Sequence, residues 1–302
     1  MRYITMILLV VLLGVLAVPA WGEGPFQVRL PVQQTGIDPE ADNVVGSPQR
    51  HIIGKGETLL DVARDHGLGY QELAASYRHW DPFIPPTGAE IVIPTRWIVP
   101  ENHKRNQIIV NTGDMRLYYY TNNATQVYTF PIGMGVLDFE TPAGVFQVVD
   151  KRVHPAWHIP QSLQKKYGMA VMAPGPDNPL GDYKLTLSWG DYGIHGTHMP
   201  WGVGRMVSHG CTRMYPEHIK QLFPMVPVGA KVEYVYEPAK IGFHHGRIYL
   251  SVHEDVYFKI RSMILHVLSL LEKRGLASRV DMQRVLQAVE EQNGVAVDIT
   301  KM

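Results

Sequence analysis

The stretch from His195 to Arg213 reads HGTHMPWGVGRMVSHGCTR and contains the strongest chemical signal in the chain. It holds Cys211, the only cysteine of the protein, together with His195, His209 and Arg213. The thiolate is the reactive form of cysteine, and an unperturbed thiol with a pKa of about 8.5 is mostly protonated at neutral pH. Because a nearby imidazole or guanidinium raises the thiolate fraction, the stretch predicts that Cys211 is a nucleophile. The alternative is an inert buried thiol, which is common for isolated cysteines.

Acyl transfer by a thiol needs a base, a group that orients the base, and N–H donors for an oxyanion. His195 ends a strand-like run, and the loop that follows is long enough to fold back, so His195 is the predicted base. Gly196 and Gly210 lack side chains, which lets a substrate backbone approach and leaves amide groups accessible. Arg213 shares a face with Cys211 if the segment is extended, and it is predicted to bind a substrate carboxylate. A core role for His195 and a structural ion pair for Arg213 are the alternatives.

Two further residues of the motif are predicted to shape the loop. His209 lies two positions before Cys211 and is expected to point away from it, with direct base function as the alternative. Ser208 is expected to make local hydrogen bonds within the turn.

A metal site is a competing interpretation of the same stretch. His195-x-x-His198 and His209-x-Cys211 offer four ligands that suit zinc. The spacing is not a common zinc pattern, and no His-Glu-x-x-His motif supplies a general base. Fourteen histidines make chance pairs such as His244-His245 expected. The sequence therefore favours a site without a metal or other cofactor.

The N-terminus is predicted to direct export. Arg2 is followed by an apolar run and by Val18-Pro19-Ala20, which fits cleavage after Ala20, so residues 1–20 are predicted to be a signal peptide. An uncleaved anchor is the alternative. We therefore expect a protein of the periplasm or cell envelope. The 28 basic and 28 acidic residues balance, which argues against nucleic acid as a partner.

The patterning predicts a mostly β protein with short helices. Residues 21–50 have little periodicity and are expected to be a linker. The apolar pattern over residues 51–95 predicts a strand, a helix that Thr58 caps, a second helix and a strand. Residues 103–238 are expected to form a mostly β domain with one or two helices and long loops, because apolar residues recur with period two. Residues 246–302 predict a strand followed by two helices, for which no role is assigned.

The segment 51–95 resembles a LysM module, through Gly-Lys-Gly-Glu-Thr-Leu at residues 54–59 and Gly-Ala-Glu-Ile-Val-Ile-Pro at residues 88–94. Such modules bind the glycan strands of peptidoglycan. Where that family usually has Asn-Pro after its second helix, this sequence has Ser76-Tyr77-Arg78. A packing module that only supports the next domain is therefore the alternative.

The motif around Cys211 resembles the signature of the L,D-transpeptidases with a YkuD-type catalytic domain. Thr141-Pro142-Ala143-Gly144 and Pro174-Gly175-Pro176-Asp177-Asn178-Pro179 are similar to the exported branch of that family. Thr212 stands where the family usually has an aliphatic residue. The resemblance covers residues 105–238 and implies that residues 103–238 form a catalytic domain of the YkuD-like β-sandwich or barrel type.

The resemblance also implies a mechanism. Cys211 would attack the peptide bond before the terminal D-alanine of a peptidoglycan tetrapeptide stem, and His195 would carry the proton. The Gly196 carbonyl would hold the imidazole, and amides around His209, Gly210 and Cys211 would bind the oxyanion. The thioester would pass to an amine of another stem or of an envelope protein, and carbapenems would inactivate the enzyme. The alternatives are an L,D-carboxypeptidase, a catalytically inactive peptidoglycan-binding protein and a zinc-dependent wall peptidase.

Overall fold

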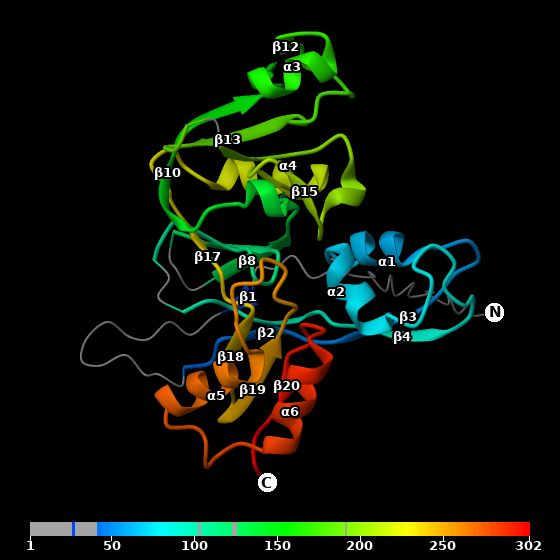
Figure 1. Cartoon of the computed structure of the whole chain (residues 1–302), viewed down its shortest axis with the longest axis vertical. Coiled ribbons are helices and arrows are strands. Elements are labelled where there is room, and N and C mark those ends of the chain that lie inside the picture. The colour runs from blue at the N-terminus through cyan, green and yellow to red at the C-terminus, as the bar shows by residue number, and fades with distance from the viewer. Residues whose placement is uncertain (1–25, 28–40, 102–103, 123–125, 191) are drawn as a thin grey trace, which may run out of the picture.

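The computed structural model describes residues 26–27, 41–101, 104–122, 126–190 and 192–302 (Figure 1). Within this part of the chain the protein is mostly β with short helices, as predicted. The predicted signal peptide, residues 1–20, lies outside the described residues. Among the described helices none is both long and apolar enough to cross a membrane.

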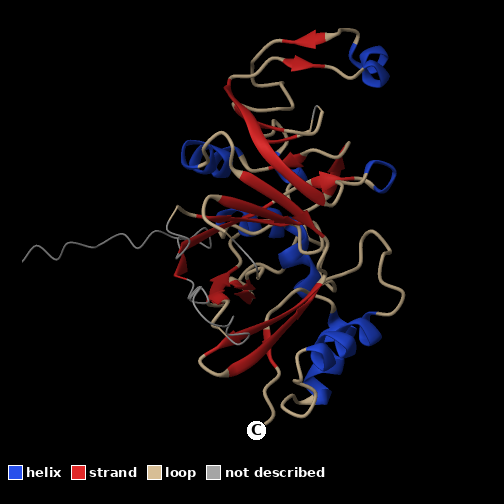
Figure 2. Ribbon diagram, turned by 90° about the vertical axis from the view of Figure 1, so that its left-hand side faces the viewer, coloured by secondary structure: helices blue, strands red, loops and turns tan. Residues whose placement is uncertain are grey.

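A nine-stranded, strongly bent sheet forms the centre of the molecule, in the order β1–β8–β7–β6–β17–β10–β13–β14–β16 (Figure 2). Its strands are β1 (Phe26–Gln27), β6 (Gln107–Asn111), β7 (Arg116–Tyr120), β8 (Gln126–Pro131), β10 (Gly144–Val153), β13 (Tyr183–Leu187), β14 (Gly193–His195), β16 (Thr212–Arg213) and β17 (Lys231–Val235). Neighbouring strands are antiparallel except for the parallel pairs β6–β17 and β14–β16. The order places β14 and β16, which carry His195 and Arg213, at one edge of the sheet.

Shorter elements surround this edge. They are β9 (Met134–Gly135), β11 (Trp157–His158), β12 (Val171–Met172), β15 (Met206–Ser208), α3 (Gln161–Tyr167), α4 (Pro216–Met225), η2 (Leu137–Phe139) and η3 (Pro200–Gly202). Strand β15 pairs in parallel with β9, and β11 pairs with β12. Pro216 occupies the first turn of α4, where its missing N–H costs nothing, as expected from the sequence.

Strands β6 and β7 are buried on both faces, so the expected alternation of buried and exposed residues is wrong for these two strands, whose sequences QIIVN and RLYYY contain continuous apolar or aromatic runs. Ile108 and Leu117 face the core beneath α4, whereas Ile109 and Tyr118 face a second core shared with the N-terminal unit. The second face is covered because the N-terminal unit packs against it.

The N-terminal unit has the predicted order strand, helix, helix, strand. Its elements are β3 (Gln49–Ile52), α1 (Leu59–Asp65), α2 (Tyr70–Ala74), η1 (Ala75–Tyr77) and β4 (Glu90–Ile93). Thr58 caps α1 through its hydroxyl, which accepts from the Asp61 amide at 3.1 Å. The capping therefore confirms the helix start that the sequence predicts.

The prediction that residues 21–50 are all irregular is wrong in the part that the structure describes. Strand β2 (Val44–Gly46) pairs with β5 (Arg96–Ile98), β3 begins within the predicted linker, and β1 extends the central sheet. These strands have two to four residues each, too few to give a period, and their partners lie far away in the sequence.

The C-terminal unit contains the predicted strand and two helices, β19 (Arg247–Val252), α5 (Met263–Lys273) and α6 (Met282–Glu291). It also contains β18 (Ala239–His244), which forms a hairpin with β19, and β20 (Val297–Asp298). The helices pack on this small sheet around a separate apolar core (Figure 1).

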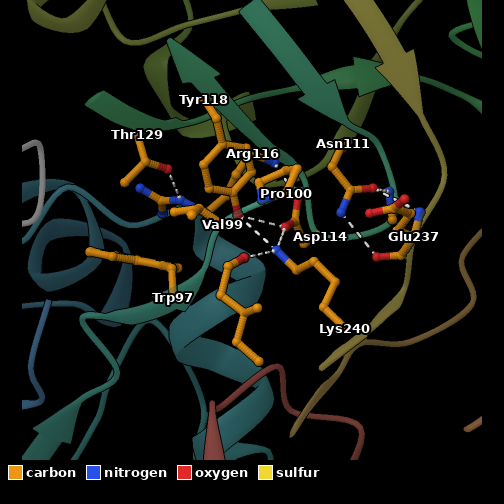
Figure 3. A network of polar contacts seen from close by, with 12 residues as sticks. Trp97, Val99, Pro100, Asn111, Asp114, Arg116, Tyr118, Thr129, Glu237 and Lys240 are labelled. Carbon is orange, nitrogen blue, oxygen red and sulfur yellow. Dashed lines mark hydrogen bonds and ion pairs between the residues drawn. The ribbon is translucent and has the colours of Figure 1, made fainter. Parts of the chain in front are cut away.

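Two buried ion pairs join both flanking units to the central sheet. Arg116 of β7 donates to both carboxylate oxygens of Glu72 in α2 at 2.8 Å. Lys240 of β18 donates to the carboxylate of Asp114, to the Tyr118 hydroxyl at 2.9 Å and to the Ile98 carbonyl at 2.6 Å (Figure 3). Because each cation is enclosed with its acceptors, the three units are fixed relative to one another.

Candidate active site

His195 ends β14, as predicted, and its side chain is buried. Its Nδ1 lies 2.7 Å from the Gly196 carbonyl oxygen, the contact that the family resemblance implies. With Nδ1–H donating to this carbonyl, Nε2 carries the lone pair of a neutral imidazole. Burial, together with the nearby cations of Arg213 and Lys184, lowers the pKa of His195 to about 3, so the ring is neutral at physiological pH.

Arg213 lies directly beside His195. The parallel register of β14 and β16 pairs His195 with Arg213 and Ile194 with Thr212. Paired residues in neighbouring strands project to the same face of a sheet, so both functional side chains share one face. Cys211 immediately precedes β16 and is partly exposed.

The Arg213 guanidinium is enclosed but incompletely satisfied. Burial lowers its pKa, while Cys211 and Tyr167 of α3 raise it, which places both groups near the cation. Its Nε is buried and has no hydrogen-bond partner among the described residues. An enclosed guanidinium with an unused donor is suited to a carboxylate ligand.

The turn before Cys211 is held by Ser208. The Ser208 hydroxyl donates to the Cys211 carbonyl at 2.6 Å and accepts from the Gly210 amide at 3.2 Å, which agrees with the predicted local bonding. The Gly210 N–H, which the family resemblance implies for an oxyanion, is directed at Ser208, and its use for an oxyanion stays a prediction. Gly210 has φ +101°, and a Cβ there would lie 2.3 Å from the ring of Tyr192.

His209 is exposed, with its ring centroid 4.6 Å from that of Phe139. The contact joins His209 to η2, and a role for His209 in shaping the loop stays a prediction.

Two residues from distant segments support the turn. Thr141 donates to the Gly210 carbonyl at 3.1 Å and accepts from the Gly135 amide at 2.9 Å. Tyr257, which follows β19, donates to the Gly135 carbonyl at 2.8 Å and accepts from the Thr141 amide at 3.3 Å. Sequence reasoning missed Tyr257, Tyr167 and Tyr192, because no local pattern distinguishes them from core tyrosines.

The loop between His195 and Cys211 is held by the N-terminal unit. The Tyr70 amide donates to the Val203 carbonyl at 3.2 Å, and Arg205 stacks over the Tyr70 ring at 3.9 Å. Next to this contact, Arg64 of α1 donates to both carboxylate oxygens of Glu217 in α4 at 2.7 and 2.9 Å. The N-terminal unit thus contacts the loop that follows His195 and also helix α4, which follows Cys211.

The ligands of the zinc alternative do not gather. Among the described residues, no group of three possible metal ligands includes His195, His198, His209 or Cys211.

Comparison with known proteins agrees with the motif. The profile of the YkuD family, described as the L,D-transpeptidase catalytic domain, matches residues 105–233. The probable L,D-transpeptidase ErfK/SrfK of Salmonella typhimurium is 31% identical over 280 residues, which covers 87% of this chain and 90% of that protein. The probable L,D-transpeptidase YbiS of Escherichia coli is 35% identical over 227 residues, covering 72% and 74%.

Among solved structures, the catalytic domain of the Enterococcus faecium L,D-transpeptidase is 24% identical, with a TM-score of 0.35. The match covers 44% of this chain and 98% of that one. The sequence comparisons carry the assignment: the chain belongs to the L,D-transpeptidase family.

Proposed function

We propose that the protein is a peptidoglycan L,D-transpeptidase in which Cys211 is the nucleophile and His195 carries the proton. The supporting observation is the parallel pairing of β14 with β16, which sets His195 beside Arg213 and next to the strand that Cys211 immediately precedes. The bond from Nδ1 to the Gly196 carbonyl fixes the imidazole so that Nε2 accepts the thiol proton.

In the first half-reaction, the Cys211 sulfur bonds to the carbonyl carbon of the third stem residue, and its proton passes to His195. The amide bond to the terminal D-alanine then breaks, and the leaving amine takes that proton. The product is a thioester plus free D-alanine. In the second half-reaction, an acceptor amine attacks the thioester, gives its proton to His195 and releases the thiol.

Arg213 is proposed to bind the carboxylate of the terminal D-alanine. Since its cation lowers the pKa of His195, pairing with a carboxylate relieves that repulsion and makes His195 a stronger base when donor is bound. Backbone groups at His209 and Cys211 are proposed to stabilise the oxyanion, with Gly196, Ser208 and Gly210 shaping the turn.

The acceptor is proposed to be an amine of a second stem, or a lysine of an envelope protein. Export through a signal peptide at residues 1–20, cleaved after Ala20, would place the enzyme in the periplasm with both. Residues 103–238 are proposed as the catalytic domain and 246–302 as a helical extension. Residues 21–50 are proposed to connect the signal peptide to the first folded unit. They contain β1, β2 and the start of β3.

Residues 51–95 are proposed to be a LysM-like module that binds glycan strands. Its loop before β4 exposes Phe83 and Ile84, apolar side chains that could stack on sugar rings. Pull-down with purified sacculi compares the protein with Phe83→Ser; equal retention of the two would reject glycan binding through this loop.

Mass spectrometry of the mature protein with a carbapenem tests the nucleophile. We expect a single covalent adduct on the wild type and none on Cys211→Ala. The same protein with muropeptides should release D-alanine, and a chelator should leave the rate unchanged. A folded wild type with a reduced thiol and no adduct would instead indicate an inactive peptidoglycan-binding protein.

A further inference from the structure

A second cluster of ligating side chains lies far from Cys211 in sequence, at the turn of the β18–β19 hairpin. Asp42, His244 and His245 bring three possible ligand atoms within 4.8 Å of one another, the only such group among the described residues. One oxygen of Asp42, Oδ2, lies 4.0 Å from Nδ1 of His244 and 3.7 Å from Nδ1 of His245. The sequence alone presents His244-His245 as a chance pair, because Asp42 is about two hundred residues away.

These separations fit a bridging ion better than hydrogen bonds. Both exceed the usual limit of about 3.2 Å for a nitrogen–oxygen hydrogen bond. Ligands about 2.1 Å from a tetrahedral zinc ion lie about 3.4 Å from one another. Closing the remaining few tenths of an ångström needs only small rotations, since the His245 side chain is 75% exposed.

The backbone around the cluster is fixed by other contacts. Asn43 exchanges two hydrogen bonds with Phe243, its amide donating at 3.0 Å and its Oδ1 accepting at 2.8 Å. The Asp42 Oδ1 accepts from the His245 amide at 2.9 Å, which leaves Oδ2 directed towards the rings. The arrangement therefore does not depend on an ion for its assembly.

One imidazole nitrogen in the cluster is left unsatisfied. His244 Nδ1 is buried and has no hydrogen-bond partner among the described residues, while the two rings lie with centroids 4.1 Å apart. His245 has φ +49°, a conformation that is uncommon for a residue with a side chain. That φ belongs to the two-residue turn His245-Gly246 of the hairpin, which requires a positive φ at both positions. The orphaned nitrogen beside a half-buried carboxylate points to a ligand that the protein groups do not supply.

We propose that Asp42, His244 and His245 bind a divalent transition-metal ion such as zinc, with solvent completing its coordination. Two imidazoles and one carboxylate are a ligand set that suits such ions and discriminates against magnesium. The ion would join the segment before β2 to the C-terminal hairpin. By closing a loop of about two hundred residues, it would stabilise the docking of the C-terminal unit.

The test is zinc titration of tag-free, chelator-stripped Cys211→Ala protein, in which the catalytic thiol cannot bind metal. Competition with a chromophoric chelator is expected to show one equivalent of bound zinc, and zinc is expected to raise the Tm. Magnesium should do neither. Asp42→Asn, His244→Gln and His245→Asn are each expected to weaken binding at least about tenfold, as losses around metal sites do.

The variants are chosen to preserve the fold. Asn at position 42 retains the acceptor for the His245 amide, and Asn at position 245 tolerates a positive φ. His154→Asn is the matched control, because His154 pairs with Asp182 on the surface and has no third possible ligand nearby in the part of the chain that the structure describes. Absence of a saturable zinc equivalent, or equal affinity in His154→Asn and His244→Gln, would overturn the proposal. Circular dichroism separates either result from unfolding.

Discussion

Gly69 and Gly204 meet backbone to backbone: a Cβ on Gly69 would lie 2.7 Å from the Cα of Gly204. Gly69 precedes α2 in the N-terminal unit, and Gly204 belongs to the loop between His195 and Cys211. The contact leaves no room for a side chain on either residue. The N-terminal unit therefore contacts the loop between His195 and Cys211 directly.

Gly204→Ala is expected to lower both stability and the rate of acylation. A Cβ on Gly204 would lie 2.3 Å from the Tyr70 amide nitrogen, so the unit and the loop must separate. The residue also has φ +79°, which adds about 1–2 kcal/mol of strain. Thermal unfolding and the rate of carbapenem adduct formation measure the two effects.

Gly229→Ala controls for the strain alone. Gly229 has φ +88°, and a Cβ there meets nothing within 4 Å. If Gly229→Ala slows acylation as much as Gly204→Ala does, the contact with the N-terminal unit has no part in catalysis.

Tyr257→Phe is expected to slow acylation and to cost about 1 kcal/mol of stability, the usual value of a hydrogen bond. The lost hydroxyl holds Gly135 and Thr141, and Thr141 in turn holds the Gly210 carbonyl. Tyr77→Phe is the matched control, because its hydroxyl also bonds a backbone amide and a backbone carbonyl, both of Val92. Equal acylation rates in the two variants would contradict a role for Tyr257 at the turn.

The parts of the site that the sequence predicts are those encoded locally. The strand end at His195, the bond of its ring to Gly196 and the turn around Ser208 all depend on neighbouring residues or a motif. Tyr257 could not be predicted, because its contact with Gly135 joins segments more than a hundred residues apart. For the same reason β2 could not be predicted. It has three residues, too few to show a period, and it pairs with the distant strand β5.

Arg213→Gln is expected to lower kcat/KM and to raise the pKa of His195. A charge-assisted hydrogen bond to the substrate carboxylate contributes about 1.5–3 kcal/mol, so its loss should reduce kcat/KM at least about tenfold. Removing the cation also removes a repulsion that disfavours the imidazolium. Steady-state kinetics and NMR titration of the His195 ring measure these changes.

Arg213→Lys separates charge from geometry. It retains the cation, so the pKa of His195 should stay near its wild-type value while kcat/KM still falls. An unchanged pKa in Arg213→Gln would show that Arg213 does not act on the imidazole.

Stability is expected to fall as the pH drops below about 6.5. Burial lowers the pKa of His195 to about 3 and that of His253 to about 4, whereas both rings titrate near 6.5 when unfolded. Between these values the unfolded chain binds more protons, which costs about 1.4 kcal/mol per pH unit for each ring. Urea unfolding between pH 4.5 and about 7.5 measures the slope. His195→Gln should reduce this slope by the contribution of one proton. A slope equal to that of the wild type would mean that His195 is protonated in the folded state.

Glu72→Gln is expected to destabilise the protein by about 3–5 kcal/mol, because it leaves the fully buried Arg116 without its counter-charge. The glutamate also accepts from the Trp97 indole at 3.0 Å and from the Gly69 amide at 2.8 Å. A glutamine directs its own donors at one of these three groups, so the loss exceeds that of a single ion pair. Glu90→Gln, which breaks an exposed pair with Arg50 in the same unit, should cost less than about 1 kcal/mol.

The double variant Glu72→Leu with Arg116→Met tests the origin of this destabilisation. It separates the loss of the ion pair from the cost of leaving one buried charge without its partner. Removing both charges avoids a buried ion without a partner, so the double variant should be more stable than either single variant. The acylation rate reports a second property, because Glu72 accepts a hydrogen bond from Gly69, which contacts the loop between His195 and Cys211. A double variant that regains stability but not acylation rate would show that the buried pair is retained for the geometry of the loop. Recovery of both stability and acylation rate would show that the geometry of the loop does not depend on the buried pair.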